Sequence, residues 1–440
     1  MAAPRTTAAA SPARASAVDR AGESAPDGLG TATPDQASSS TSEGLAHVAT
    51  VSFLASRAIP AGGFLVALAG GVALARAGQQ TGPRRGYGAS IAAVLETTAT
   101  MGPARFNVPV TQALTAPLLG RLDARGTRAS TQVVVCALLR LLHNAAVSAF
   151  FVVVIAGGID EYAAAFDALV GWALPLPAGR PVALGALGLG LLAWSVFAST
   201  VQVVVYRRGL AAWPGTRGET SPRDLDPEHD PAPPAPRRFD PRAVGLATVL
   251  ALAVLLSSTS WIPLALVTAW LAVGFLVARV DREPLAVGMT LAVVLGAGAL
   301  LVGVLGGVGL DAALRRGLRA TLLVVAATWL RAAAGDAGLR EVLRRVLGRL
   351  RPLPSVPEAM EVLDGLGSQR RLVRSAQALR RRVGAVAKRP SALLAVTLRW
   401  IAGESRRVAG TPAPRPVMKA RARDGLLVAS AALLAVGPIL

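Results

Sequence analysis

Long apolar runs, separated by short polar stretches, dominate this 440-residue chain. A helix that crosses a membrane needs about 20 apolar residues. The pattern predicts spans or half-spans at 48–75, 87–119, 133–155, 181–206, 243–256, 261–278, 285–308, 318–330 and 425–440. We therefore expect an all-α polytopic membrane protein. It has about four spans or half-spans in an N-terminal module, then four spans, amphipathic cytoplasmic helices and a final span.

Some of these runs are irregular. Gly102-Pro103 and Pro109 interrupt the run at 87–119, which predicts a re-entrant hairpin or two half-spans. Backbone groups freed at such a break must be buried in protein or line a wet cavity. The runs at 243–256, 318–330 and 425–440 are short, so they need tilt, neighbouring helices or local thinning of the bilayer.

The polar stretches divide the chain into four regions. Residues 1–46 are rich in Ala, Ser, Thr and Pro and predict a disordered tail. An N-terminal membrane module follows at 47–206, and then a Pro-rich cytoplasmic linker at 207–241. A second membrane module occupies 242–440 and contains basic amphipathic helices at about 336–410.

Composition excludes several classes of protein. Hydrophobic residues make up 52% of the chain and charged residues 16%, against roughly 25% charged residues in a soluble domain. So little charge cannot cover a water-facing surface, which excludes a small soluble enzyme, a coiled coil and a wholly disordered protein. Cys136 is the only cysteine, which excludes a disulfide framework.

Basic residues are distributed unevenly along the chain, whose net charge is +20. Residues 331–424 contain 21 Arg and Lys against 7 Asp and Glu. Because basic loops of membrane proteins stay inside, we expect this stretch and the linker to be cytoplasmic and the acidic loop around Glu161 to be outside. Nucleic acid is the weaker interpretation as a partner, since Trp400 is the only aromatic residue of this basic stretch that could stack on a base.

Motifs of soluble enzymes are absent from the sequence. It contains no His-Glu-x-x-His, no Gly-x-Ser-x-Gly and no Walker sequence. Its three histidines, His47, His143 and His229, lie too far apart for a local metal signature. We therefore expect this chain to hold no catalytic residue, no metal and no cofactor.

Two groups of polar residues interrupt the apolar runs: Glu96, Arg105 and Asn107, and Arg140, His143 and Asn144. The first group flanks the break at Gly102-Pro103, where it forms either a substrate or ion site or a Glu96–Arg105 pair that pins the hairpin. The second group shares one helical face, because its members are three and four residues apart. It either contacts a ligand or hydrogen-bonds to neighbouring helices.

Two amphipathic helices are predicted in the basic stretch. Apolar residues recur at helical spacing along 339–350 and again along 372–386. The arginines proposed to contact a partner flank these stripes: Arg344, Arg370, Arg371, Arg374 and Arg381. The helices either lie on anionic lipid or dock onto a partner protein, and periodicity does not separate the two.

Short motifs give the second module a family resemblance. Phe239-Asp240-Pro241-Arg242 precedes its first span, and Met-Lys-Ala-Arg-Ala-Arg-Asp-Gly-Leu (418–426) precedes the last. In these motifs, and in the order of four spans, basic helices and a final span, residues 238–440 resemble the transmembrane T component of energy-coupling factor (ECF) transporters. The Ala-Arg-Gly motifs of that family's coupling helices are absent from the basic stretch.

The resemblance implies a multi-pass subunit of the bacterial inner membrane without a catalytic site of its own. Such a subunit couples ABC ATPase partners, which bind the ATP, to uptake of a vitamin or metal, and a separate substrate-binding membrane component is a further partner. Asp240, Pro241 and Arg242 would form the family's helix-start motif, and the five arginines would contact the ATPases. The alternative is a membrane scaffold whose basic helices bind anionic lipid or a non-ATPase partner.

Overall fold

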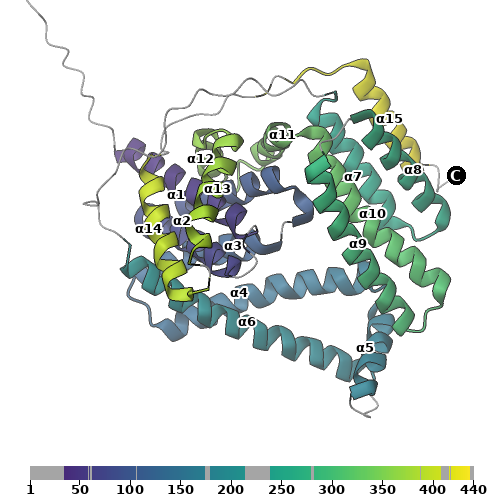
Figure 1. Ribbon diagram of the computed structural model, residues 1–440, viewed down its shortest axis with the longest axis horizontal. Helices are drawn as coiled ribbons and strands as arrows, with labels where there is room; N and C mark the ends of the chain where they lie inside the picture. The colour runs from purple at the N-terminus through teal and green to yellow at the C-terminus, as the bar shows by residue number, and fades with distance from the viewer. Residues whose placement is uncertain are drawn as a thin grey trace, which may run out of the picture.

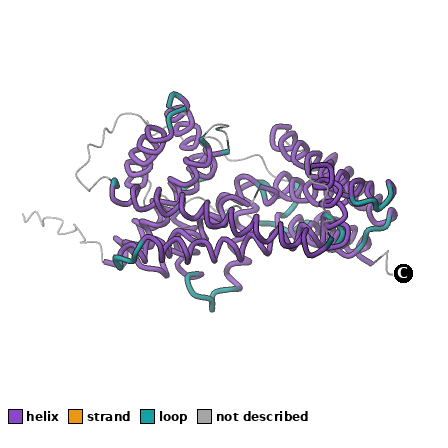
Figure 2. Tube along the Cα trace, turned by 90° about the horizontal axis from the view of Figure 1, so that it is seen from below, coloured by secondary structure: helices purple, strands orange, loops and turns teal. Residues whose placement is uncertain are grey.

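The chain is described here from a computed structural model covering residues 34–57, 59, 62–105, 107–173, 179–213, 238–278, 282–386, 388–407, 416 and 418–436. Every element of secondary structure in these ranges is helical (Figure 1, Figure 2). The predicted all-α class is therefore confirmed for the described residues.

The helices before the linker are α1 (Pro34–Ser56), α2 (Gly63–Met101), α3 (Asn107–Ala124), α4 (Ala129–Phe150), α5 (Ile159–Ala173) and α6 (Arg180–Ala211), with short turns η1 (Pro103–Arg105) and η2 (Phe151–Ile155). After it come α7 (Pro241–Ser257), α8 (Trp261–Ala278), α9 (Arg282–Leu305) and α10 (Leu310–Ala334). The basic stretch forms α11 (Asp336–Arg349), α12 (Val356–Gly365), α13 (Gln369–Gly384) and α14 (Pro390–Arg407), and α15 (Ala422–Val436) follows.

Five helices of the described chain are long and apolar enough to cross a membrane: 129–155, 180–211, 261–278, 285–305 and 310–334. They correspond to five of the predicted runs. Their outward faces carry large apolar side chains, with Leu142 69%, Leu189 69% and Leu276 79% exposed. Such faces suit lipid rather than water, as expected for a membrane protein. Helix α7 is also apolar but has only 17 residues.

The two runs nearest the N-terminus take a different form from the one predicted. No helix in the described parts of 48–75 and 87–119 meets the length and hydropathy of a span. Helix α1 ends at Ser56, and α2 bends at Gly82, whose φ is 82°, immediately before Pro83. Other helices, rather than an open apolar face, cover most of α2, because it packs against α1, α3, α12 and α14.

The predicted hairpin at Gly102-Pro103 is present as a turn between helices. The chain leaves α2 at Gly102, whose φ is 88°, and α3 runs back along α2. The hydroxyl of Tyr87 donates to the carbonyl of Leu114 at 3.1 Å across this hairpin. A positive φ favours glycine, since it has no Cβ to clash.

The tail predicted to be disordered over 1–46 is helical in its last part. Helix α1 begins at Pro34, and the side chains of Ser42, Leu45 and Ala46 are buried. Residues 1–33 lie outside the described residues. The sequence pattern misses this segment because its helix is specified by packing against distant helices rather than by its own apolar periodicity.

The basic helices pack on the helices that begin the chain. In Figure 1, α12, α13 and α14 lie with α1 and α2 on one side, and α7 to α10 with α15 form a bundle on the other. Helices α4 and α6 pack together at one end and diverge toward α5, which contacts α9. The two membrane modules assigned from sequence therefore share a folded interior.

The acidic segment expected outside the cell contacts the beginning of α10. Arg316, at the start of α10, forms an ion pair with Glu161 of α5 at 3.0 Å. Its Nη1 also donates to the carbonyl of Ala156 at 2.9 Å. The starts of α7, α11 and α15 meet one another elsewhere, so the arrangement is compatible with the topology that the charges predict.

Single-cysteine labelling in intact cells tests this topology. We expect a membrane-impermeant maleimide to label a cysteine at Ala168, which is exposed on α5. It should not label a cysteine at Gln377, which is exposed on α13 in the basic stretch. The native Cys136 is buried and should give a low background. Labelling at Gln377 without cell lysis would contradict a cytoplasmic basic stretch.

Acid should weaken the fold through His47, which lies on α1 and is fully buried with no partner in the described structure for either ring nitrogen. Burial, with the nearby Arg371 adding to it, lowers the pKa of His47 to about 3. Because the pKa of His47 is lower in the folded state than its unfolded value of about 6.5, the unfolding free energy is highest above pH 6.5. It decreases as the pH falls toward 3. The unfolding free energy should thus drop by about 2 kcal/mol from pH 6.5 to pH 5.

Denaturant titrations in detergent at pH 7.5 and pH 5 measure this loss. In the His47→Leu variant the drop between the two pH values should be smaller than in the unmodified protein. An equal drop in both proteins would show that His47 does not titrate over this range.

Candidate functional site

The best-defined polar site lies where α7, α11 and α15 begin. Asp240 is the N-cap of α7, and its Oδ1 accepts from the backbone nitrogen of Arg242 at 2.8 Å. The guanidinium of Arg242 donates to both carboxylate oxygens, at 3.1 and 2.8 Å. Pro241 occupies the first helical position, where a missing N–H costs nothing. The Asp-Pro-Arg motif is thus a complete helix start.

The motif before the last helix joins the same site. The backbone nitrogen of Asp240 donates to Oδ1 of Asp424 at 2.8 Å. Oδ2 of Asp424 accepts from the backbone nitrogen of Arg421 at 2.7 Å, at the start of α15. Asp424 is only 4% exposed, so both of its oxygens are used in the interior. Two motifs separated by 184 residues therefore meet at one point.

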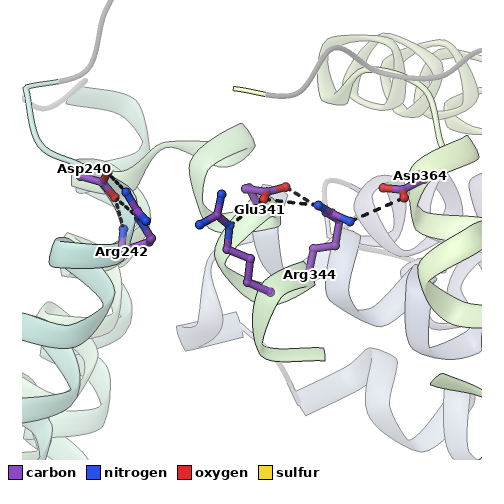
Figure 3. Close-up of polar contacts among 6 residues, drawn as sticks. Asp240, Arg242, Glu341, Arg344 and Asp364 are labelled. Atoms are coloured by element: carbon purple, nitrogen blue, oxygen red, sulfur yellow. Dashed lines mark hydrogen bonds and ion pairs between the residues drawn. The ribbon is translucent and has the colours of Figure 1, made fainter. Parts of the chain in front are cut away.

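Helix α11 packs directly against this junction. A Cβ at Gly338 would clash with the ring of Pro241, so glycine permits the close approach. Three residues further on, Glu341 accepts from Nε of Arg344 at 2.9 Å and from Nε of Arg345 at 2.8 Å. Arg344 continues the chain of charges to Asp364 of α12, at 3.6 Å (Figure 3).

Electrostatics favour the ionised forms of these carboxyls. The hydrogen bond from the Arg242 side chain holds the pKa of Asp240 below its usual value, although burial acts the other way. Burial also tends to raise the pKa of Glu341, but the hydrogen bonds from Arg344 and Arg345 outweigh it and the net shift is downward. Both carboxylates therefore stay charged at neutral pH, and the network persists.

A second charged contact connects α11 to the N-terminal helices. Nε of Arg340 lies 3.1 Å from Oε2 of Glu96 on α2, whose side chain is fully buried. The same guanidinium donates to the carbonyls of Leu363, Leu366 (2.9 Å) and Gly367 (3.2 Å) at the end of α12. Burial raises the pKa of Glu96, and Arg340 opposes that rise.

This contact changes the interpretation of the break in run 87–119. One of the two interpretations of the sequence pairs Glu96 with Arg105; in the structure Glu96 contacts Arg340 of α11. The side chains of Arg105 and Asn107 lie outside the described residues. A partner 244 positions away cannot be found from local spacing.

The arginines of α13 lie on the outer side of a buried helix. Its apolar stripe is covered by α1, and Leu372, Leu379 and Val383 are 0% exposed beside Val51 and Ala55. The proposed contact residues on the other side are Arg370, Arg374 and Arg381, which are exposed, and Arg371, which is half-buried near His47. The predicted stripe is confirmed.

The group of Arg140, His143 and Asn144 takes part in contacts between helices. Arg140 Nη2 donates to Gln202 Oε1 of α6 at 2.5 Å, and Asn144 donates to Ser195 at 3.3 Å. Gln202 in turn donates to Thr115 of α3 at 2.7 Å. His143 Nε2 has no hydrogen-bond partner among the described residues. Interhelical hydrogen bonding, one of the two predicted roles, is observed for Arg140 and Asn144.

The sequence analysis did not identify two partner residues: Glu341 in the ionic network and Gln202 in the contacts of Arg140. Glu341 has a visible signal, because Arg344 and Arg345 follow it at spacings of three and four on one helix face. Gln202 has only a weak signal, as a polar residue inside an apolar run. In the described part of the chain, no three His, Cys, Asp or Glu side chains gather as metal ligands.

Comparisons with known proteins do not add to this description. A scan of family models, a search of curated proteins and a search of solved structures each found no match to this chain. The proposals below therefore depend on the residues and contacts of the chain itself.

Removing Arg340 should strongly destabilise the fold, because it leaves the buried Glu96 without its ion-pair partner and three carbonyls without their donor. We expect Arg340→Met to lower the unfolding free energy by about 3–5 kcal/mol, measured by denaturant titration in detergent. Arg349→Met is the control on the same helix, exposed and without a described partner, and should change it by less than about 0.5 kcal/mol.

A double variant isolates the ion pair from the rest of the site. Glu96→Gln with Arg340→Met should be more stable than the sum of the single effects predicts, by roughly 0.5–3 kcal/mol. If the effects of the two single substitutions simply add, the Glu96–Arg340 pair does not contribute to stability.

Proposed function

We propose that this chain is a membrane subunit of an ECF-type ABC importer in the bacterial inner membrane, and that it couples ATPase partners to uptake of a small molecule. The contact between Asp240 and Asp424 carries the proposal, because it joins the two motifs on which the family resemblance depends. The ATP would be bound by the partner subunits, and a substrate-binding membrane component would be a further partner.

The packing around this contact suits the transmission of force. Helix α11 contacts α7 at the Pro241–Gly338 approach and α12 through Arg344 and Asp364. A docked ATPase that displaced α11 would therefore also move the starts of α7 and α15. Close packing and ionic contacts of this kind resist independent sliding of the helices that they join.

The burial of α13 favours docking over a lipid-bound helix. An amphipathic helix on a bilayer inserts its apolar face between the lipids. The apolar face of α13 is covered by α1, with Leu372 and Leu379 0% exposed, so only its polar side is available. A fixed array of arginines suits a protein partner, since guanidinium groups bind acceptors with defined geometry.

One observation favours the alternative of a scaffold that binds anionic lipid. Near its C-terminal end, α11 exposes Val346 (53%) and Leu350 (45%) beside the exposed Arg349. Apolar side chains next to arginine are the composition that binds a membrane interface. The two functions use arginine differently, and this difference provides the test.

Single Arg→Lys substitutions keep the charge but change the geometry. The variants are Arg344→Lys, Arg370→Lys, Arg371→Lys, Arg374→Lys and Arg381→Lys, with Arg349→Lys as the control. For the importer function we expect Arg371→Lys or Arg381→Lys to abolish co-purification with a co-expressed ABC ATPase pair, and the control to have no effect.

The scaffold function predicts a different result. Attraction to anionic lipid depends on total charge, at about 1 kcal/mol for each cation near the surface. Lys variants would then behave like the unmodified protein, and binding would fall only as arginines are replaced by Gln. That outcome would contradict coupling through these residues.

A further inference from the structure

An open surface cavity of about 390 Å³ lies where the last turns of α3 and α6 meet α2 just before its bend at Gly82, away from the ionic network described above. Its lining residues are Gln79, Asp123, Arg207, Arg208, Leu210 and Ala211. Two adjacent arginines in the last turns of a span-length helix give the cavity its charge.

The charges of the cavity favour an anion. Asp123 lies 3.7 Å from Nε of Arg207, a distance that leaves the guanidinium able to donate elsewhere. Arg208 has no carboxylate partner among the described residues, so the lining carries a net charge of about +1. Arg76 Nη1 donates to Oε1 of Gln79 at 2.6 Å, which leaves the amide nitrogen of Gln79 as its free donor.

The position of the cavity indicates where the anion comes from. Val204, one turn before Arg207, is 43% exposed on the apolar surface of α6, and the partly buried Trp213 follows the helix. An apolar surface that ends in arginine and tryptophan is typical of the boundary between hydrocarbon and headgroups. Basic pockets at the cytoplasmic boundary bind the headgroups of anionic lipids.

We propose that this cavity binds the phosphate group of an anionic membrane phospholipid, with Arg207, Arg208 and the amide of Gln79 as donors. Arginine suits this group because its planar fork can donate two parallel hydrogen bonds to phosphate oxygens. The proposal concerns a different surface from the coupling site, so either can fail without the other.

Native mass spectrometry of the full chain in detergent, titrated with phosphatidylglycerol, tests the site. We expect Arg207→Gln with Arg208→Gln to weaken retention of the first bound lipid by about fivefold for each arginine. The control is Arg125→Gln with Arg128→Gln, which removes the same charge from exposed arginines that do not line the cavity. The control should retain the lipid like the unmodified protein.

Two further measurements keep the test independent of folding. Asp123→Asn raises the charge of the cavity and should tighten lipid binding, a direction that misfolding does not produce. Inorganic phosphate at matched concentration should not displace the lipid. Equal loss in the control, weaker binding by Asp123→Asn, or full displacement by inorganic phosphate would each overturn the assignment.

Discussion

The guanidinium of Arg340 is the contact on which the arrangement of the whole chain depends. It ends α12 by donating to three carbonyls and meets the only carboxylate buried in α2, Glu96. This guanidinium therefore holds α2, from the first part of the chain, against α11 and α12, from the last part. A buried charge tolerates little displacement of its partners, because an unpaired ion in the interior is costly. The register of α11 against α2 is therefore fixed.

Two kinds of surface follow from this arrangement. Helices α4, α6, α8 and α9 expose apolar side chains that suit lipid, whereas α11 and α13 expose arginines. The ionic network lies between them: Asp240 caps the start of α7, and Glu341 lies within α11, which reaches α12 through Arg344. Partly exposed charged side chains can keep one face in water and still contact a neighbouring helix with the other. Polar contacts between helices thus occur both in this network and, through Arg140 and Gln202, between the span-length helices α4 and α6.

Local features of this structure were predictable from the sequence, and distant pairings were not. Residues only a few positions apart specify the cap formed by Asp240 and Pro241. The same is true of the buried stripe of α13. The partner of Glu96 and the helix that covers Leu372 lie more than 200 positions away, so no periodicity points to them. The helical segment at 34–46 was missed for the same reason, because its burial comes from tertiary contacts.

The packing of α13 and α14 on α1 has a consequence for the synthesis of the protein. The face of α1 that includes Val51 and Ala55 is covered by residues made more than 300 positions later. At roughly 5–20 residues per second, the ribosome takes tens of seconds to supply them. During that time α1 packs against α2 but lacks the contacts that α13 and α14 later provide. This face of α1 is therefore covered late, only after α13 and α14 have been made.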